Sequence, residues 1–263
     1  MLPERTVQFD LLQSGKDSLR HALEHVGHLD MILGSHDSGD LKASILSVAQ
    51  PAELLLKERL RRVHPRFVWR DPDDYPRTPA FTVNITAAMD RLKSIAGIRF
   101  SPEAEVAIRR ARTLRNAATH GDFAVDALEM KELIGDVLSF VFWFAREHLE
   151  SDLEAELRAE PCYQASLMVY ELWAPHAISL EQQLRNAGKH LAPCPECAAT
   201  TYLIEDSHCA LCGSDQRGVE CPRCGITVPE TDCISMDAIL PDGSVGVVHY
   251  CVHCIPGTTN DGP

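Results

Sequence analysis

The sequence predicts a mainly α-helical protein that ends in a small domain of short β-hairpins. Through most of the first 190 residues, apolar side chains recur at intervals of three and four, the spacing of amphipathic helices. After Pro193 this period ends, Cys, Pro and Gly dominate, and eight of the ten cysteines form Cys-x-x-Cys pairs. We therefore expect an antiparallel helical bundle at 1–150, a helical connector at 151–191 and a cysteine-rich module at 192–263.

The first half of the bundle is expected to contain two long helices and one short helix. Apolar spacing predicts the long helices over 14–33 and 41–63, the first ending at Gly34 and the second kinked or divided by Pro51. Residues 64–79 contain four prolines and no period, which predicts a long loop. A short helix is expected around 87–95.

The second half of the bundle is delimited by capping residues. Ser101 precedes Pro102 and predicts a helix that begins there. Gly121 is expected to end that helix in the left-handed conformation. Asp126, with Glu129 three residues later, predicts the start of the most apolar helix.

The connector begins with an acidic helical stretch after residue 147. Apolar spacing predicts two further helical segments there, around 163–173 and 178–190.

Composition and charge limit the compartment and the partners. No apolar run is long enough to cross a bilayer, and the N-terminus lacks a basic start followed by an apolar stretch, so we expect a cytoplasmic protein with reduced thiols. The net charge of −13 argues against nucleic-acid binding through the overall field. Ten basic residues nevertheless gather in two short stretches: Lys57, Arg59, Arg61, Arg62, Arg66 and Arg70, then Arg109, Arg110, Arg112 and Arg115. These stretches form either a local positive face or solvated helix faces paired with nearby Glu.

The Cys-x-x-Cys pairs predict two structural zinc ions, because four thiolates complete a closed tetrahedral site. The pairs are Cys194/Cys197, Cys209/Cys212, Cys221/Cys224 and Cys251/Cys254. Sequential pairing is the simplest arrangement, and interleaved pairing is the alternative. Glycines directly after two of the pairs permit tight turns that aim backbone N–H groups at the sulfurs. Non-ligand roles are expected for the remaining candidates: Cys233, His208, His249 and His253.

The long insert before the last pair, CISMDAIL-PDG-SVGVVHYC, predicts two strands around a Pro-Asp-Gly turn. With the four cysteine pairs, this pattern resembles a tandem zinc ribbon or a rubredoxin-like knuckle module.

The segment LRNAATHGDF contains Arg115, four intervening residues and His120, at the end of one predicted helix and before a long amphipathic helix. This motif and helix order resemble the HEPN family of small all-helical domains, in which a polar residue, here Asn116, usually follows the Arg. The segment AELLLKERL is similar to the family's Glu–Lys helix and supplies Glu53 and Lys57. The resemblance covers about residues 14–149 and implies a HEPN-like bundle.

The resemblance also implies a metal-independent endoribonuclease of the toxin or defence type that acts as a homodimer. His120 would then handle the proton of the ribose 2′-hydroxyl or of the leaving oxygen, and Arg115 would bind the scissile phosphate. Asn116 and Glu53 complete the candidate catalytic set. Candidate RNA contacts from the basic stretches are Lys57, Arg61 and Arg112. A second match, Arg185 to His190, precedes the cysteine module with no following Gly, and we treat it as coincidence.

Helix geometry constrains this candidate site. Asn116 and His120 share a helix face, whereas Arg115 lies about 140° from His120 around an ideal helix. A long Arg side chain, a frayed helix end or a second protomer must therefore bring the two groups together. Arg115 also falls within an apolar arc, so it requires a partner, and Glu53 is our candidate.

The alternative is a non-catalytic scaffold or adaptor. In that case Arg115 and His120 hold helices together, and the zinc module recruits RNA or a protein partner such as an antitoxin. Residues 205–242 of the module carry eight acidic residues beside Arg217 and Arg223, which favours a protein partner or a structural role over RNA.

Overall fold

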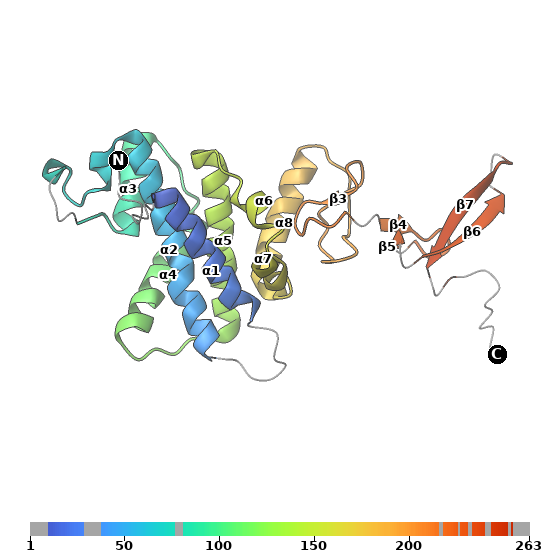
Figure 1. Ribbon diagram of the computed structural model, residues 1–263, viewed down its shortest axis with the longest axis horizontal. Coiled ribbons are helices and arrows are strands. Elements are labelled where there is room, and N and C mark those ends of the chain that lie inside the picture. Colours follow the sequence, from blue (N-terminus) through green and yellow to red (C-terminus); the bar gives the residue numbers. More distant parts are fainter. Residues whose placement is uncertain are drawn as a thin grey trace, which may run out of the picture. The chain divides into compact units, whose positions relative to one another are not determined.

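The structure is a computed structural model that describes residues 10–28, 38–76, 81–215, 218–225, 227–230, 233–239, 243–251 and 254. Within these residues the chain forms eight α-helices followed by short antiparallel strand pairs, which confirms the mainly α fold with a small zinc-ribbon-like region. The chain divides into two compact units, Met1–His176 and Ala177–Pro263. Figure 1 shows the long helices of the first unit lying side by side.

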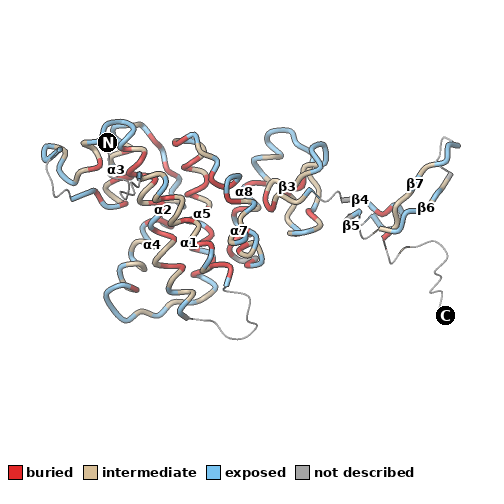
Figure 2. Tube along the Cα trace, viewed as in Figure 1, coloured by how far each residue is buried: buried red, intermediate tan, exposed pale blue. Residues whose placement is uncertain are grey.

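The first unit is a bundle centred on its second helix. Its elements are α1 (Leu11–Gly27), α2 (Ser38–Val63), the 3-10 turns η1 (Pro65–Val68) and η2 (Pro72–Asp74), α3 (Ile85–Ala96), α4 (Pro102–His120), α5 (Ala127–Leu149), α6 (Leu153–Leu157) and α7 (Pro161–Ser166). Helix α8 (Tyr170–Asn186) begins in this unit and ends in the second. Helix α2 contacts α1, α3, α4 and α5, and Figure 2 shows buried residues along α2 and α5. The apolar faces predicted from the sequence therefore meet around α2.

Capping residues set the ends of the long helices. Ser101 and Asp126 accept backbone hydrogen bonds as the N-caps of α4 and α5, which confirms both predicted starts. Gly121 follows α4, but its φ of −158° is extended, so the predicted left-handed end is wrong. The backbone N–H of Gly121 donates to the carbonyl of Ala117, and the chain leaves the helix in an extended conformation that any residue could adopt.

Three other predictions from the sequence concern where helices continue and where they end. Helix α2 runs through Pro51 as one element, so Pro51 does not divide it, and the predicted kink stays a prediction. Residues 163–190 break at 167–169 rather than between 173 and 178, so that α8 includes Pro175. Helix α1 ends at Gly27, well before the predicted stop at Gly34, so the predicted end was wrong; Gly34 itself lies outside the described residues.

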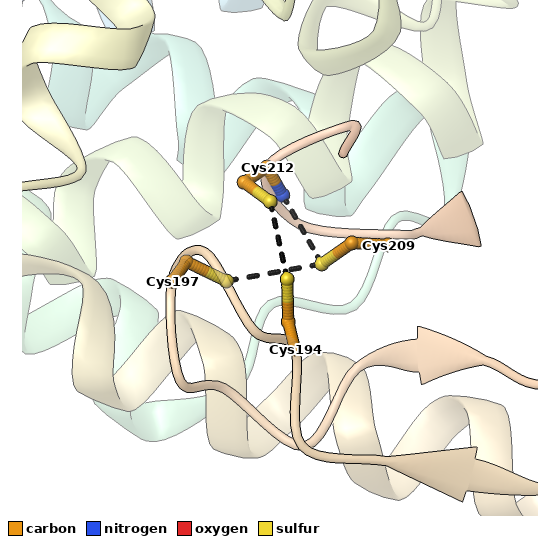
Figure 3. A group of neighbouring side chains, drawn as sticks. All are labelled: Cys194, Cys197, Cys209 and Cys212. Carbon is orange, nitrogen blue, oxygen red and sulfur yellow. Dashed lines mark hydrogen bonds between the residues drawn. The ribbon is translucent and has the colours of Figure 1, made fainter. Parts of the chain in front are cut away.

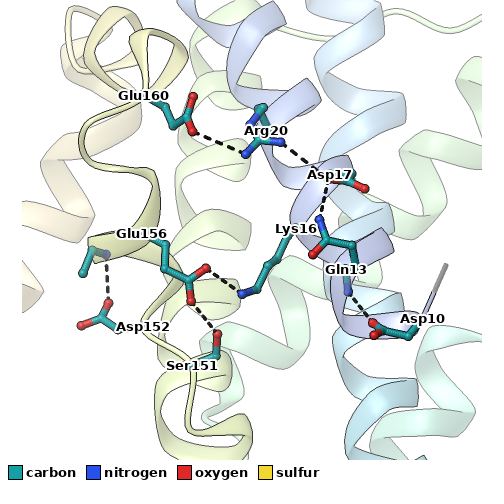
Figure 4. A network of polar contacts seen from close by, with 10 residues as sticks. Asp10, Gln13, Lys16, Asp17, Arg20, Ser151, Asp152, Glu156 and Glu160 are labelled. Atoms are coloured by element: carbon teal, nitrogen blue, oxygen red, sulfur yellow. Dashed lines mark hydrogen bonds and ion pairs between the residues drawn. The ribbon is translucent and has the colours of Figure 1, made fainter. Parts of the chain in front are cut away.

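Helices α6 and α7 pack with the bundle through α1. The ammonium of Lys16 lies 2.6 Å from Glu156, and the guanidinium of Arg20 lies 3.5 Å from Glu160 (Figure 4). A Cβ on Gly27 of α1 would lie 2.9 Å from the Cβ of Ala165 in α7. Close backbone approach and two ion pairs therefore fix this part of the connector against the first helix.

A buried polar network joins α6, α7 and the start of α8. The carboxylate of Glu154 lies 3.0 Å from Nε2 of His176 and accepts a 3.2 Å hydrogen bond from the hydroxyl of Tyr163. All three side chains are buried. Burial raises the pKa of Glu154, but the hydrogen bond and charge of His176, with the charge of Arg158, outweigh burial and lower the pKa overall.

We expect Glu154→Ala to destabilise the helical unit by about 3–5 kcal/mol, because it leaves His176 buried without its partner. Since the folded pKa of Glu154 is lowered, its contribution is present above the ordinary carboxyl pKa of about 4.3 and disappears as pH falls through the lowered value. Urea unfolding followed by far-UV circular dichroism measures both effects. Glu156→Ala, in the same helix but with a half-exposed side chain, is the control and should cost about 1 kcal/mol or less. Equal losses in the two variants would contradict the prediction.

The second unit contains three small antiparallel sheets. These are β1 (Leu191–Ala192), β2 (Tyr202–Leu203) and β3 (His208–Cys209) in that order, then β4 (Gly218–Glu220) with β5 (Thr227–Pro229), and β6 (Cys233–Ile239) with β7 (Val245–Cys251). The last pair confirms the two predicted strands. Pro241 and Asp242 of the predicted turn lie outside the described residues, and Gly243 has a φ of +83°.

Candidate functional site

The eight paired cysteines gather into two groups, and the grouping follows sequence order. One group is Cys194, Cys197, Cys209 and Cys212, and the other is Cys221, Cys224, Cys251 and Cys254. The sulfurs of each group lie within 4.8 Å of one another. The cysteines therefore have the sequential arrangement rather than the interleaved one.

The sulfur spacing fits a tetrahedral metal ion. Sulfurs at about 2.3 Å from zinc stand about 3.8 Å apart in a tetrahedron. Cys194 and Cys212 are 3.6 Å apart, and Cys197 and Cys209 are 3.8 Å apart, with all four side chains pointing toward one another (Figure 3). Cys224 and Cys251 of the second group are also 3.8 Å apart. Both groups are compatible with structural metal ions and leave no open position for water.

Backbone turns after the pairs position the sulfurs. Gly213 and Gly225 have φ values of +79° and +72°, so both need the conformation that glycine adopts without strain. Their N–H groups donate to the carbonyls of Cys209 and Cys221 and so close the two turns. In the first group, the N–H of Cys212 reaches the sulfur of Cys209 at 3.5 Å. The glycines therefore close the turns, and neighbouring residues direct N–H groups at the sulfurs.

Each group contains a thiol whose pKa is lowered to near neutral pH. Hydrogen bonds from the neighbouring thiols, that of Cys197 first, lower the pKa of Cys194 to about 7. Burial raises the pKa of Cys221, but the backbone N–H groups of Cys251, Arg223 and Cys224 lower it to about 6 overall. Thiolates are the form that binds metal, so each group has a ligand that deprotonates near neutral pH.

The remaining candidate ligands have other contacts. Nδ1 of His208 lies 2.9 Å from Asp215, and Nδ1 of His249 lies 2.9 Å from the hydroxyl of Ser235. Cys233 pairs in register with Cys251 across β6 and β7 and belongs to neither group among the described residues. His253 lies outside the described residues.

A second polar cluster lies where α2, α3 and α4 meet. The guanidinium of Arg115 on α4 is 3.4 Å from the carboxylate of Glu53 on α2, which confirms the expected partner. Glu53 also accepts a 2.6 Å hydrogen bond from Lys57, whose ammonium donates to Thr82 at 2.9 Å. Lys57 is buried, whereas the side chain of Arg115 is 39% exposed. A ligand in solvent can therefore reach the arginine but not the lysine.

The other predicted RNA contacts divide between this cluster and the end of α2. Arg112 donates to the hydroxyl of Thr86 at the start of α3, at 2.9 Å. Arg61 instead makes two hydrogen bonds to Glu58, of 2.7 and 2.9 Å. With three basic residues and the single carboxylate of Glu53, the cluster of Lys57, Arg112, Arg115 and Glu53 carries two net positive charges on an acidic protein.

The structure does not bring His120 into that cluster within one chain. His120 and Asn116 are both exposed on α4, and no hydrogen bond or ion pair joins the imidazole of His120 to another described residue. The second match to the Arg–His motif has different surroundings from the first. Arg185 pairs with Glu181 on α8, and His190 lies beyond that helix and pairs with Glu205.

Sequence reasoning missed two polar residues of the cluster. Thr82 and Thr86 contact Lys57 and Arg112, yet both lie beside or within a short helix that the sequence analysis treated only as structural. Asn84 between them is the N-cap of α3, a signal that could have placed these threonines at an exposed helix start.

The fold and the cysteine groups define a helical protein with a zinc-ribbon-like C-terminal region. Comparison with protein-family models, with curated proteins and with solved structures found no match for this chain. Over the part of the chain that is described, each helix is too short or too polar to traverse a lipid bilayer.

Proposed function

We propose that the helical unit is a metal-independent endoribonuclease of the HEPN type, related to toxin or defence systems, and that it acts as a homodimer in the cytoplasm. The half-exposed Arg115 beside Glu53 carries the proposal. A solvent-reachable guanidinium held at a three-helix junction, on an otherwise acidic protein, is suited to bind one phosphate of an RNA backbone. Lys57 and Arg112 add positive charge on either side of the pair.

The proposed reaction transfers the phosphodiester to the ribose 2′-oxygen. One His120 accepts the proton of the 2′-hydroxyl, the freed oxygen bonds to the adjacent phosphorus, and the bond from phosphorus to the 5′-oxygen breaks. His120 of the partner subunit returns a proton to that 5′-oxygen. Arg115 binds the nonbridging oxygens, where negative charge accumulates.

Two copies are required because one chain separates the groups. Arg115 turns toward α2, whereas His120 faces solvent about 140° around the same helix and about 7.5 Å further along its axis. A two-fold axis near the exposed face of α4 would place the His120 side chains of two copies opposite each other. Val106 on that face is 62% exposed and would be covered in such a dimer.

We assign no catalytic step to the zinc module. Four thiolates complete each site, so two bound zinc ions would stabilise β1–β3 and β4–β7 without an open position. The module is then free to contact a protein partner, such as an antitoxin.

We expect His120→Ala to lower cleavage of a single-stranded RNA by about 10²- to 10⁴-fold, because a proton-transfer group is lost from an exposed position without change to the core. Cleavage is measured by gel electrophoresis in buffer without added divalent cations, with and without a chelator. His21→Ala, an exposed histidine on α1, is the control and should cleave as the wild type does. Equal cleavage by wild type and His120→Ala, or no cleavage by the wild type, would refute the proposal.

A non-catalytic scaffold is the second candidate, favoured by one observation. The ion pair of Arg115 with Glu53 already joins two helices, whereas His120, exposed and without a polar partner among the described residues, does not hold helices together as this alternative expects. On this alternative no form of the protein cleaves RNA, and Arg115 serves to join α4 to α2.

A further inference from the structure

An aromatic side chain stands in solvent beside the proposed RNA site. The side chain of Phe81 is 68% exposed, more than the other phenylalanines of the described chain. Its backbone is nevertheless fixed, because the carbonyl of Phe81 accepts a 2.6 Å hydrogen bond from the N–H of Arg70. The N–H of Val83 donates to the carbonyl of Val68 at 3.0 Å, so the two segments pair on both sides of Thr82, the residue after Phe81. The ring is therefore held in place without being buried.

Arg91 of α3 secures the opposite segment. Its guanidinium donates to the backbone carbonyls of Phe67 (2.8 Å), Trp69 and Arg70. One side chain thus satisfies three carbonyls of a segment that forms only an isolated bridge. Phe81 consequently presents its ring from a rigid support, which lowers the entropic cost of binding a planar ligand.

A cation covers part of the ring of Phe81. The guanidinium carbon of Arg70 lies 5.2 Å from the ring centroid, within the range of a cation–π contact. The carboxylates next in the chain are used internally, since Asp71 accepts from the N–H of Asp73 and Asp73 pairs with Arg66 at 2.8 Å. Arg70 is exposed and remains available to a phosphate.

A chain of contacts links the Phe81 segment to the proposed site. Phe81 precedes Thr82, which accepts a hydrogen bond from Lys57, and Lys57 pairs with the same Glu53 that pairs with Arg115. The segment that carries the exposed ring and its arginine is therefore joined to the proposed phosphate-binding arginine through Lys57 and Glu53.

We propose that Phe81 is a stacking residue that binds a nucleobase of single-stranded RNA, while Arg70 contacts the neighbouring phosphate. The inference rests on the proposed function and specifies its substrate class. Every base has a flat π-face, so stacking selects an unpaired strand over a duplex and is tolerant of sequence. The positive charge of the cluster is complementary to that strand.

The test measures affinity separately from cleavage. A fluorescein-labelled single-stranded RNA with methylated 2′-hydroxyls cannot be cleaved, and its binding to the full chain is followed by fluorescence anisotropy. We expect Phe81→Ala to weaken binding about 5- to 150-fold and Phe81→Trp to retain it. Met168→Ala, at a residue 77% exposed on the same unit, is the control and should bind as the wild type does. Arg70→Ala should also reduce the salt dependence of binding, whereas Phe81→Ala should not.

The outcomes separate this inference from the ribonuclease proposal. If the wild type binds the oligonucleotide, Phe81→Ala weakens binding and no form cleaves unmodified RNA, the stacking residue stands and the ribonuclease fails. If Phe81→Ala and wild type bind equally, or the wild type does not bind, the stacking inference is overturned whether or not RNA is cleaved. Equal affinity for a duplex of the same sequence would overturn it as well.

Discussion

Removal of metal should unfold the cysteine-rich unit and leave the helical unit folded. The strands β1, β2 and β3 have two residues each, and half of the buried residues around them are the cysteines themselves. So small a core cannot offset the entropy of ordering the chain, and four thiolates 3.6–3.8 Å apart repel one another without a cation. Structural zinc supplies about 10–16 kcal/mol of binding free energy in comparable peptides, which is then folding free energy.

Metal analysis and hydrogen exchange measure this effect. We expect two zinc ions per chain in the wild type and one in Cys209→Ser, with loss of amide protection over residues 191–214 and unchanged protection in α2 and α5. Cys233→Ser is the matched control, because Cys233 lies in the same unit outside both groups, and it should keep two ions. Two ions retained by Cys209→Ser, or fewer than two bound by Cys233→Ser, would contradict the assignment of ligands.

Substitution of the buried Gly135 by alanine should destabilise the helical unit more than an equally small substitution at an exposed position. A Cβ at Gly135 of α5 would lie 2.1 Å from the carbonyl oxygen of Leu172 in α8 and 3.0 Å from its carbonyl carbon. The obstruction is backbone, so no side-chain rotation relieves it, and the two helices must move apart. Overpacking of this kind costs about 3 kcal/mol or more, against a gain of about 1 kcal/mol from the helix propensity of alanine.

Urea unfolding of Gly135→Ala tests this contact. We expect a net loss of about 2 kcal/mol or more relative to the wild type. Gly121→Ala is the matched glycine control, because the added Cβ meets only the carbonyl of Ala117 at 3.9 Å and the backbone is extended there. A Gly135→Ala protein as stable as the Gly121→Ala protein would show that α8 does not pack against α5 as described.

Different physical effects stabilise the two units, so the stability of each can be changed separately. The helical unit buries large apolar side chains such as Phe142, Phe144 and Leu56, so the hydrophobic effect stabilises it. The cysteine-rich unit has short strands and depends on metal coordination. Loss of zinc should therefore unfold the second unit without destabilising the first.

Much of the fold could be predicted because the signals are local. The helix starts at Ser101 and Asp126 are local features. At each start the capping side chain accepts a hydrogen bond from a backbone N–H in the first turn of the helix. The Cys-x-x-Cys pairs are also a local signal, because only two residues separate the cysteines that turn toward one ion. The left-handed end predicted at Gly121 was wrong because residue type permits that conformation without requiring it, and the following chain leaves α4 extended.

By itself, the sequence determined the helical class, the cysteine pairs and the candidate partners of Arg115. Only the tertiary structure decided that Glu53, 62 residues away, lies against Arg115, that Thr82 reaches Lys57, and that His120 faces solvent. Periodicity and spacing follow from backbone geometry within a few residues. Contacts between distant segments depend on how the whole bundle packs around α2, which no short stretch of sequence specifies.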